Sequence, residues 1–252
     1  MKKISIIIPS LNQGKFIEKT ITSLLDQKYP NLEIIVMDGG STDSTIEILK
    51  KYEPDVKWVS ESDKGQTNAI NKGLKVTSGE IIGYLNSDDF LLPDSLFSIA
   101  DGFEDEEVLW LTGDYIIIDS DGKPIQSAIV KYKQLLRKFS SIKLLLITNY
   151  IIQPSTFWRK SFSNQIGEFD ESLKYVMDYD YWIRAYKISR PKIIHEPLSS
   201  FRIHKQSKGG SQYERQFEEE YRVSKRYTRN KILKISHKIH NFFIILFYKL
   251  IK

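Results

Sequence analysis

The chain has 252 residues, of which 41% are hydrophobic and 27% are charged, and both proportions are ordinary for a folded domain with a sizeable core. It contains no cysteine, so disulfide bonds, thiolate metal sites and thiol nucleophiles are excluded. No segment reaches the roughly 18 to 20 continuous apolar residues that a membrane span requires. The apolar run at residues 4–8 is too short for a secretion signal and ends at Pro9, so it predicts a core strand in a cytoplasmic protein.

The net charge of +5 is unevenly distributed along the chain. Residues 221–252 carry nine Lys or Arg residues and no Asp or Glu, whereas the other 220 residues carry 28 basic and 32 acidic side chains. A mildly acidic body is therefore followed by a strongly basic tail. Such an asymmetry bears on where the protein binds and not on its fold.

The first 100 residues alternate between predicted strands and predicted helices. Short runs rich in Ile and Val predict strands at residues 3–9, 33–37, 56–59 and 80–85. Apolar residues spaced by three and four predict helices at residues 14–27, 44–52 and 66–76. Ser44 and Glu47 have the spacing of a capping box. This alternation is typical of βαβ units and predicts a parallel sheet.

Polar loops follow all four predicted strands, at residues 10–12, 38–40, 61–65 and 86–89. Each loop alone is also consistent with a tight turn or a helix cap. Right-handed crossovers, however, place the carboxyl ends of parallel strands at one edge of the sheet. Ligands bind at that edge in open α/β sheets, so the convergence of the loops predicts a binding site.

The loop Asn86-Ser87-Asp88-Asp89 brings two adjacent carboxylates to the end of a buried strand. Mg²⁺ is usually held by one or two carboxylates together with substrate phosphates. The segment therefore suggests a metal–diphosphate site. The glycines of the other loops do not have the spacing of a P-loop or a dinucleotide-binding fingerprint, which disfavours kinase-like and nicotinamide chemistry.

The order of these motifs resembles the family 2 glycosyltransferases. The resemblance is dense over residues 3–100, thinner to about residue 205, and places residues 86–89 where that family has its DXD motif. It implies an α/β GT-A fold, with a Rossmann-like, mostly parallel sheet flanked by helices. Residues 1–210 would form the glycosyltransferase domain, with a nucleotide-binding half at 1–100 and an acceptor-binding half at 101–210. Residues 211–252 would form a helical extension.

The resemblance also implies an activity. A sugar would pass from a nucleoside-diphosphate sugar, with UDP favoured, to a hydroxyl of a glycan or lipid-linked acceptor. A divalent metal, Mn²⁺ or Mg²⁺, would stabilise the leaving diphosphate as a Lewis acid, and an Asp would take the proton of the attacking hydroxyl. Single displacement of this kind inverts the anomeric carbon.

Matching positions supply the candidate donor-site residues. Asp38 is expected to face the base, Asp63 the base or ribose, and Asn86 the ribose. Metal binding is assigned to Asp88, and Asn86 departs from the family by being neutral where Asp is usual. The lost charge would either weaken metal binding or leave Asp89, a further candidate contact to the donor or diphosphate, to compensate. The nucleotide-binding set is Pro9, Ser10, Asn12, Asp38, Asp63, Lys64, Asn86 and Ser87.

The catalytic base is expected in the second half of the chain. The run Asp178-Tyr179-Asp180-Tyr181-Trp182 opens an amphipathic helix, where the family usually has Glu-Asp, and Met177 replaces the Glu. Asp178 is assigned as the base. Both aspartates also suit the N-terminus of a helix without any catalytic role. Asp180 is the alternative base, although two positions along a helix it points to a different side.

Two further segments carry candidate contacts. Gln153 is assigned to the donor or the acceptor, or else is a polar residue of an edge strand. Residues 201–207 match an Arg-x-His-x-x-Ser segment of the family and lead into a flexible stretch at 208–211. We expect this segment to close over the diphosphate. Positive charge would come from Arg202, His204 or Lys205, and His204 is also a candidate metal ligand.

The basic tail is predicted to be helical at residues 211–228 and 231–252. Apolar residues of the second helix recur at steps of three and four, and Lys231, Lys234 and Lys238 lie off that stripe. This pattern is typical of a helix lying in a membrane surface, drawn to anionic lipid, which would make the protein peripheral at the inner face of the cell membrane. The alternative is packing on the body or on a second subunit of a homo-oligomer.

Two other functions are weighed against transfer. A non-catalytic nucleotide-sugar-binding partner is allowed by Asn86 and Met177, but Asp88 and Asp178 argue against it. Nucleic-acid binding is disfavoured, because the basic residues accompany an apolar stripe and the body is acidic. No nucleic-acid partner is therefore expected.

Overall fold

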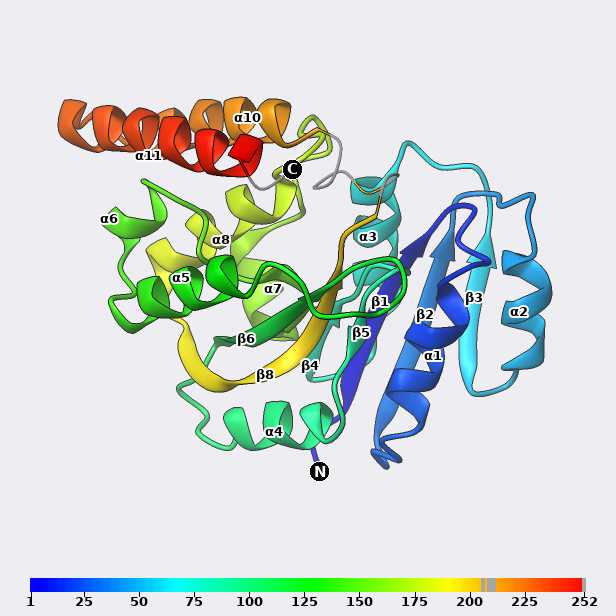
Figure 1. The fold of residues 1–252 in the computed structure, drawn as a ribbon. Coiled ribbons are helices and arrows are strands. Elements are labelled where there is room, and N and C mark those ends of the chain that lie inside the picture. Colours follow the sequence, from blue (N-terminus) through cyan, green and yellow to red (C-terminus); the bar gives the residue numbers. More distant parts are fainter. Residues whose placement is uncertain (205–206, 208–211, 251–252) are drawn as a thin grey trace.

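A computed structural model describes residues 1–204, 207 and 212–250. Within these residues one eight-stranded sheet has the order β3-β2-β1-β4-β7-β6-β8-β5 and is covered by helices on both faces (Figure 1). The strands are β1 (Ile4–Ser10), β2 (Leu32–Asp38), β3 (Val56–Ser60), β4 (Ile81–Tyr84), β5 (Phe90–Leu91), β6 (Trp110–Ile118), β7 (Thr156–Arg159) and β8 (Lys192–Arg202).

The helices fill the connections between these strands and form the C-terminal extension. They are α1 (Ile17–Leu25), α2 (Thr45–Lys51), α3 (Gln66–Val76), α4 (Ser95–Gly102), α5 (Ser127–Lys138), α6 (Ile142–Leu145), α7 (Lys160–Ile166), α8 (Met177–Ile188), α10 (Tyr213–Tyr227) and α11 (Lys231–Leu250), with a short 3-10 turn at Gln153–Ser155. The predicted elements of the first 100 residues are all present, with ends that differ by up to three residues.

The half of the sheet built from β1 to β4 is parallel, as predicted. β1 pairs in parallel with both β2 and β4, and β2 pairs in parallel with β3. The carboxyl ends of these four strands therefore lie at one edge. β7 is antiparallel to β4 and β6, and joins this half to the parallel pair of β6 and β8.

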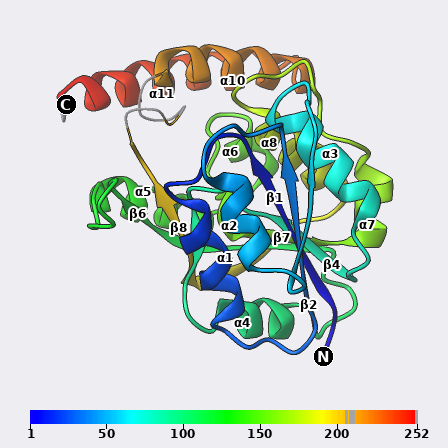
Figure 2. The same ribbon diagram turned by 90° about the vertical axis from the view of Figure 1, so that its right-hand side faces the viewer.

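Alternation along the strands divides the core into two layers. Ile4, Ile6 and Ile8 of β1 pack with α1, α2 and α4 on one face. Ile7 packs on the other face with α3, α7 and α8, and Figure 2 shows α1 and α2 across the sheet from α3 and α7. The sheet therefore has an apolar layer on each face, and its polar loops lie at one edge.

The expected capping box at Ser44 is wrong. The Ser44 side chain makes no capping hydrogen bond. Asp43 accepts hydrogen bonds from the backbone N–H groups of Thr45 (3.0 Å) and Gly14 (2.9 Å) instead. A Cβ at Gly14 would lie 2.2 Å from the Ser44 hydroxyl, so this hydroxyl packs against the loop after β1 and not over its own helix.

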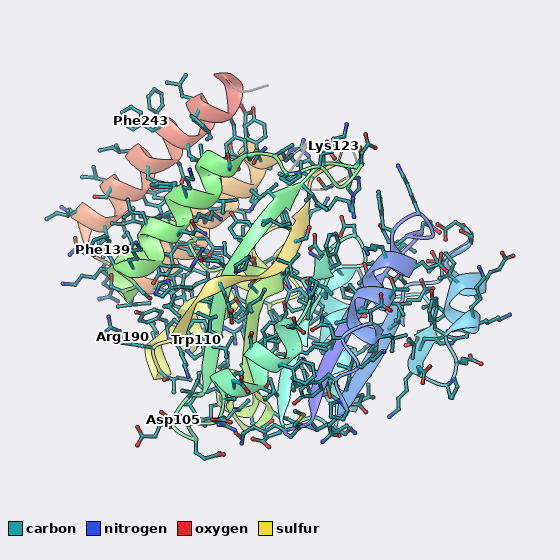
Figure 3. The ribbon with its side chains drawn as sticks, turned by 60° about the horizontal axis from the view of Figure 1, so that its bottom comes forward. Asp105, Trp110, Lys123, Phe139, Arg190 and Phe243 are labelled. Carbon is teal, nitrogen blue, oxygen red and sulfur yellow. The ribbon has the colours of Figure 1, made fainter. Side chains whose placement is uncertain are left out.

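The C-terminal extension is a hairpin of α10 and α11 that lies along one side of the molecule, far from α1 and α2 (Figure 1). On α10, the residues Glu219, Glu220, Val223 and Ser224 are buried against the body. On α11, large apolar side chains are exposed, and Figure 3 shows Phe243 on the side turned away from α5. No helix in the described part of the chain is long and apolar enough to cross a membrane.

A buried ion pair joins the sheet to α5. The Nε of Arg137 donates to Asp114 Oδ1 (2.9 Å), its terminal nitrogens contact Asp114 and the Tyr150 carbonyl, and only 1% of Arg137 is exposed. Gln134 donates to the other carboxylate oxygen of Asp114 (3.0 Å). A pair of this kind contributes little net stability when intact but is costly to break.

We therefore expect Asp114→Ala to lower the free energy of unfolding by about 3–5 kcal/mol, because it leaves a buried guanidinium without its carboxylate. Chemical denaturation followed by circular dichroism measures the change. As a control, Glu61→Ala removes the partly exposed partner of Lys72 and should cost no more than about 1 kcal/mol. Equal losses in the two variants would contradict this account of Asp114.

Candidate active site

A cavity of about 720 Å³ opens at the carboxyl edge of the parallel strands. This volume lies within the ~300–1,000 Å³ of pockets that take ligands the size of drugs and cofactors. Its walls come from the loops after β1, β3 and β4, from the end of β8, and from the segment before α8. Nine candidate residues line it: Pro9, Ser10, Asp63, Lys64, Asn86, Ser87, Asp88, Arg202 and His204.

Asp38 and Asn12 do not line this cavity. The Asp38 carboxylate accepts hydrogen bonds from the N–H groups of Gly40 (3.1 Å) and Ser41 (2.8 Å) and from the Ser60 hydroxyl (2.7 Å). Asn12 accepts the N–H of Thr42 (2.8 Å). Both side chains therefore tie neighbouring loops together at the edge of the sheet.

The loop after β3 supplies a carboxylate to the cavity wall. Asp63 Oδ1 accepts the N–H of Gly65 (2.7 Å), directly before the first residue of α3. A Cβ at Gly39 would lie 2.9 Å from Asp63 Oδ2, so a glycine at position 39 is what lets the two loops approach. The N-terminal turn of α3, with Gln66 and Thr67, also faces the cavity, where its backbone N–H groups favour an anion.

Asp88 and His204 form the polar centre of the cavity. Asp88 Oδ2 and His204 Nε2 lie 3.0 Å apart, and 19% and 10% of their side chains are exposed. The His204 ring packs on Phe16, with 4.9 Å between ring centroids. A carboxylate and an imidazole so placed fit two positions of a divalent cation whose other ligands are phosphate oxygens. No cluster of three His, Asp or Glu ligands occurs in the described part of the chain.

Asp89 is buried beneath this pair. It is 1% exposed and does not line the cavity. Its Oδ1 accepts the backbone N–H of Arg202 (2.8 Å), and its Oδ2 accepts the amide of Asn86 (3.0 Å). Burial, together with the neighbouring Asp88, raises the pKa of Asp89 well above its usual range. The two adjacent aspartates therefore occupy different environments.

Arg202 is held at the cavity wall with its guanidinium already engaged. It donates to the carbonyl oxygens of Asp88 (2.9 Å) and Asp119 (3.1 Å) and lies over the ring of Phe16, 5.0 Å from its centroid. Its positive charge is thus fixed beside Asp88. Lys205, the third predicted cation of this segment, lies outside the described residues, as do residues 208–211.

A second cavity, of about 230 Å³, adjoins the first. Gln66, Asn86 and Phe201 line both. The side-chain amide of Gln66 donates to Asn86 Oδ1 (2.6 Å), and that of Asn86 donates to Gln153 Oε1 (3.1 Å). These three amides form the border between the two cavities. Gln153 lines the second cavity and not the first.

Asp178 lies in the second cavity and not in the first. It is the second residue of α8 and is partly exposed. Burial is the largest cause that raises the pKa of Asp178, to about 6, while the backbone N–H of Tyr179 opposes the rise. A carboxylate with this pKa is ionised at neutral pH and is more basic than an exposed aspartate.

Asp180, the alternative base, lines neither cavity. Its two oxygens accept hydrogen bonds from Tyr227 (2.6 Å) and Arg184 (2.9 Å), and it is 3% exposed. The structure therefore separates the two aspartates of the motif. One faces a cavity, and the other links α8 to α10.

Several cavity residues escaped the sequence analysis. Glu171 and Lys174 line the large cavity, and Glu220 of α10 lines the small one. The family resemblance thins before these positions. The charged pattern of α10 predicts an exposed helix and not a cavity wall, so the sequence holds no local signal for Glu220.

Comparison with known proteins identifies the family. The glycosyl transferase family 2 pattern matches residues 5–166. The chain belongs to this family. A glycosyltransferase of Rickettsia typhi, itself uncharacterized, is 32% identical over 210 residues, which are 80% of this chain and 64% of that protein. Chondroitin synthase of Escherichia coli is 30% identical over 199 residues, 77% of this chain and 28% of that protein. The chain thus spans less than two thirds of either relative.

Solved structures share the fold of this chain. The mannosyltransferase PcManGT of Pyrobaculum calidifontis, in complex with GDP-Man and Mn²⁺, has a TM-score of 0.73 at 17% identity, over 96% of this chain and 69% of that chain. TarS of S. aureus, in complex with UDP-GlcNAc, has a TM-score of 0.67 at 21% identity, over 88% and 65%. The predicted GT-A fold is confirmed.

Proposed function

We propose that the protein transfers a sugar from a nucleoside-diphosphate sugar to an acceptor hydroxyl, by a single displacement that inverts the anomeric carbon. One observation carries the proposal. Two cavities meet at Gln66 and Asn86, with Asp88 and His204 in the larger and Asp178 in the smaller. A cation site and a basic carboxylate on opposite sides of a shared border suit a reaction in which leaving group and nucleophile lie on opposite sides of one carbon.

The larger cavity would hold the donor. Asp63 and the N-terminal turn of α3 suit the nucleoside and its phosphates, and Lys64 and Arg202 add positive charge. Asp88 and His204 would hold the divalent metal, Mn²⁺ or Mg²⁺, which when bound would stabilise negative charge on the leaving diphosphate. The solved neighbours with UDP-GlcNAc and with GDP-Man and Mn²⁺ support a donor of this class. The family resemblance favours UDP.

The smaller cavity would hold the acceptor hydroxyl. Asp178 takes the hydroxyl proton while the oxygen attacks the anomeric carbon. The bond from that carbon to the diphosphate oxygen breaks, and its electron pair leaves with the diphosphate. Protonated Asp178 then returns the proton to solvent. The raised pKa of Asp178, about 6, makes the carboxylate a stronger base while leaving it mostly ionised at neutral pH.

We expect Asp178→Asn to lower transfer by at least about 100-fold, because a general base contributes roughly 10²- to 10⁴-fold. Binding of UDP should be unchanged, since Asp178 lies outside the larger cavity. In the wild type, kcat/KM should fall as the pH drops through about 6, when Asp178 becomes protonated. The assay is release of UDP from UDP-sugars in the presence of Mn²⁺ and glycan acceptors.

Asp180→Asn is the matched control, because it alters the same motif outside both cavities. It should retain transfer within about tenfold, as expected for a residue that positions and does not react. A larger loss in Asp180→Asn than in Asp178→Asn would reverse the assignment of the base.

We also propose that α11 binds the membrane surface that carries a lipid-linked acceptor. Ile232, Ile239, Phe242 and Phe243 are 52–73% exposed along one side of α11. Lysines accompany this stripe, and α11 contains no acidic residue. A basic helix with an exposed apolar stripe suits the boundary between headgroups and acyl chains of anionic lipid. The alternative, that the extension packs on a second subunit of a homo-oligomer, stays a prediction.

Co-sedimentation with liposomes tests this membrane proposal. The wild type should bind phosphatidylglycerol vesicles more tightly than phosphatidylcholine vesicles, because each lysine near an anionic surface adds roughly 1 kcal/mol. Phe243→Glu should weaken binding by about tenfold or more, since a buried aromatic ring contributes about 1.5–3 kcal/mol. Val76→Glu alters an exposed apolar residue on α3 and should have no effect. Absence of vesicle binding in the wild type would refute the proposal.

A further inference from the structure

We infer that the hairpin of α10 and α11, which lies beyond the residues matched by the family, completes the acceptor side of the active site. In this inference the hairpin forms a wall for one sugar ring of the acceptor and positions the helix that carries Asp178. The inference rests on the proposed function and assigns its acceptor site to residues outside the family match.

The first observation is the wall of the smaller cavity. Phe217 and Glu220 of α10 and Tyr248 of α11 line it together with Tyr115 and Ile152, and Tyr248 packs against the apolar cluster that contains these two residues. A pyranose ring has an apolar face that packs on aromatic side chains and hydroxyls that need polar partners, and binding pockets combine these two kinds of lining. The hairpin supplies both kinds.

The size of this cavity limits its occupant. Its volume of about 230 Å³ is below the ~300–1,000 Å³ typical of drug-sized ligands. One sugar ring is therefore a better match than an oligosaccharide. The remainder of the acceptor would extend outside, and the cavity would recognise only the ring that carries the attacking hydroxyl.

The second observation concerns Glu219, the residue before Glu220. Its Oε2 accepts hydrogen bonds from the backbone N–H groups of Lys174 (3.1 Å), Tyr175 (2.6 Å) and Val176 (3.2 Å). These residues directly precede α8, in which Asp178 is the second residue. Hydrogen bonds to an ionised group are about twice as strong as neutral ones, and Glu219 is 4% exposed. The carboxylate therefore fixes where α8 begins.

The third observation is the set of charged groups around Asp178. Glu220 accepts the N–H of Asn149 (2.9 Å), and burial raises the pKa of Glu220 to about 7, with Lys133 opposing. Glu220 raises the pKa of Asp178 and Lys133 lowers it, while Tyr84 is also within electrostatic reach of Asp178. Glu220 of the hairpin and Asp178 of α8 thus line the same cavity, within electrostatic reach of each other.

Buried polar contacts hold the hairpin in this position. The Ser224 hydroxyl donates to the Leu146 carbonyl oxygen (2.7 Å), and His237 Nδ1 lies 2.8 Å from the same oxygen. The Asn241 amide donates to the Phe217 carbonyl oxygen (3.0 Å) and so joins α11 to α10. Buried hydrogen bonds of this kind are costly to break, so the wall is a fixed part of the folded body.

Variants of Glu219 test the positioning role. Glu219→Ala should lower kcat by about tenfold or more, equivalent to roughly 1.4 kcal/mol of transition-state stabilisation, while UDP binding measured by calorimetry with Mn²⁺ stays within about twofold of the wild type. Amide hydrogen exchange at residues 174–176 should accelerate, because three N–H groups lose their acceptor. Glu219→Gln keeps a carbonyl oxygen and should restore part of both properties. Glu218→Ala, on the exposed side of the same turn, should match the wild type.

Variants of the wall test the binding role. With UDP-sugar donors and a panel of methyl glycosides as acceptors, Phe217→Ala and Tyr248→Ala should raise the acceptor KM by about tenfold and leave the donor KM within about twofold. Phe139→Ala removes an exposed ring directly after α5 (Figure 3) and should change neither.

The outcomes separate this inference from the proposed function. Failure of the wild-type protein to bind any nucleoside diphosphate would contradict the proposed function. A wild type that binds UDP but accepts no methyl glycoside overturns the single-ring cavity, and unchanged exchange at residues 174–176 in Glu219→Ala overturns the positioning role. If the wild type transfers sugar and the hairpin variants behave like the controls Glu218→Ala and Phe139→Ala, the inference is wrong while the proposed function stands.

Discussion

The carboxyl group of Asp89, buried between the loop after β4 and the end of β8, is the contact on which the candidate active site depends. It accepts the backbone N–H of Arg202 and the side-chain amide of Asn86. Because Arg202 in turn donates to the Asp88 carbonyl oxygen, the two segments cannot move independently. The loop is thereby held with Asp88 beside His204 and with Asn86 at the border of the two cavities.

This arrangement gives neighbouring acidic residues different tasks, and the same division occurs twice more. Asp88 faces a cavity while Asp89 is buried. Asp178 faces the smaller cavity while Asp180 joins α8 to α10. In α10, Glu219 holds the segment before α8 while Glu220 lines the cavity. In each pair one carboxyl group is buried and hydrogen-bonded within the fold while the other lines a cavity, and supporting bonds of this kind are what reactive groups require.

The sequence predicts those features that depend on local pattern. Strands and helices of the first half follow from apolar spacing, and the meeting of their loops follows from the handedness of βαβ units. The burial of Asp89 and the use of Asp38 within a turn depend on contacts between distant segments, so they could not be predicted. The same holds for Glu220, because a charged sequence pattern predicts a solvent-exposed helix unless the surface that packs against the helix is known. The Ser44 cap failed because Gly14, thirty residues earlier, packs against that hydroxyl.

The central claim is that the cavity beside Asp88 and His204 binds a nucleoside diphosphate together with a divalent cation. Isothermal titration of UDP into the wild type and into Asp88→Asn, each with and without Mn²⁺, measures this most directly. The account predicts that Mn²⁺ tightens UDP binding to the wild type by about tenfold or more, equivalent to roughly 1.4 kcal/mol, and that this gain is lost in Asp88→Asn. An equal gain in both proteins, or no binding of UDP, GDP or any other nucleoside diphosphate to the wild type, would contradict it.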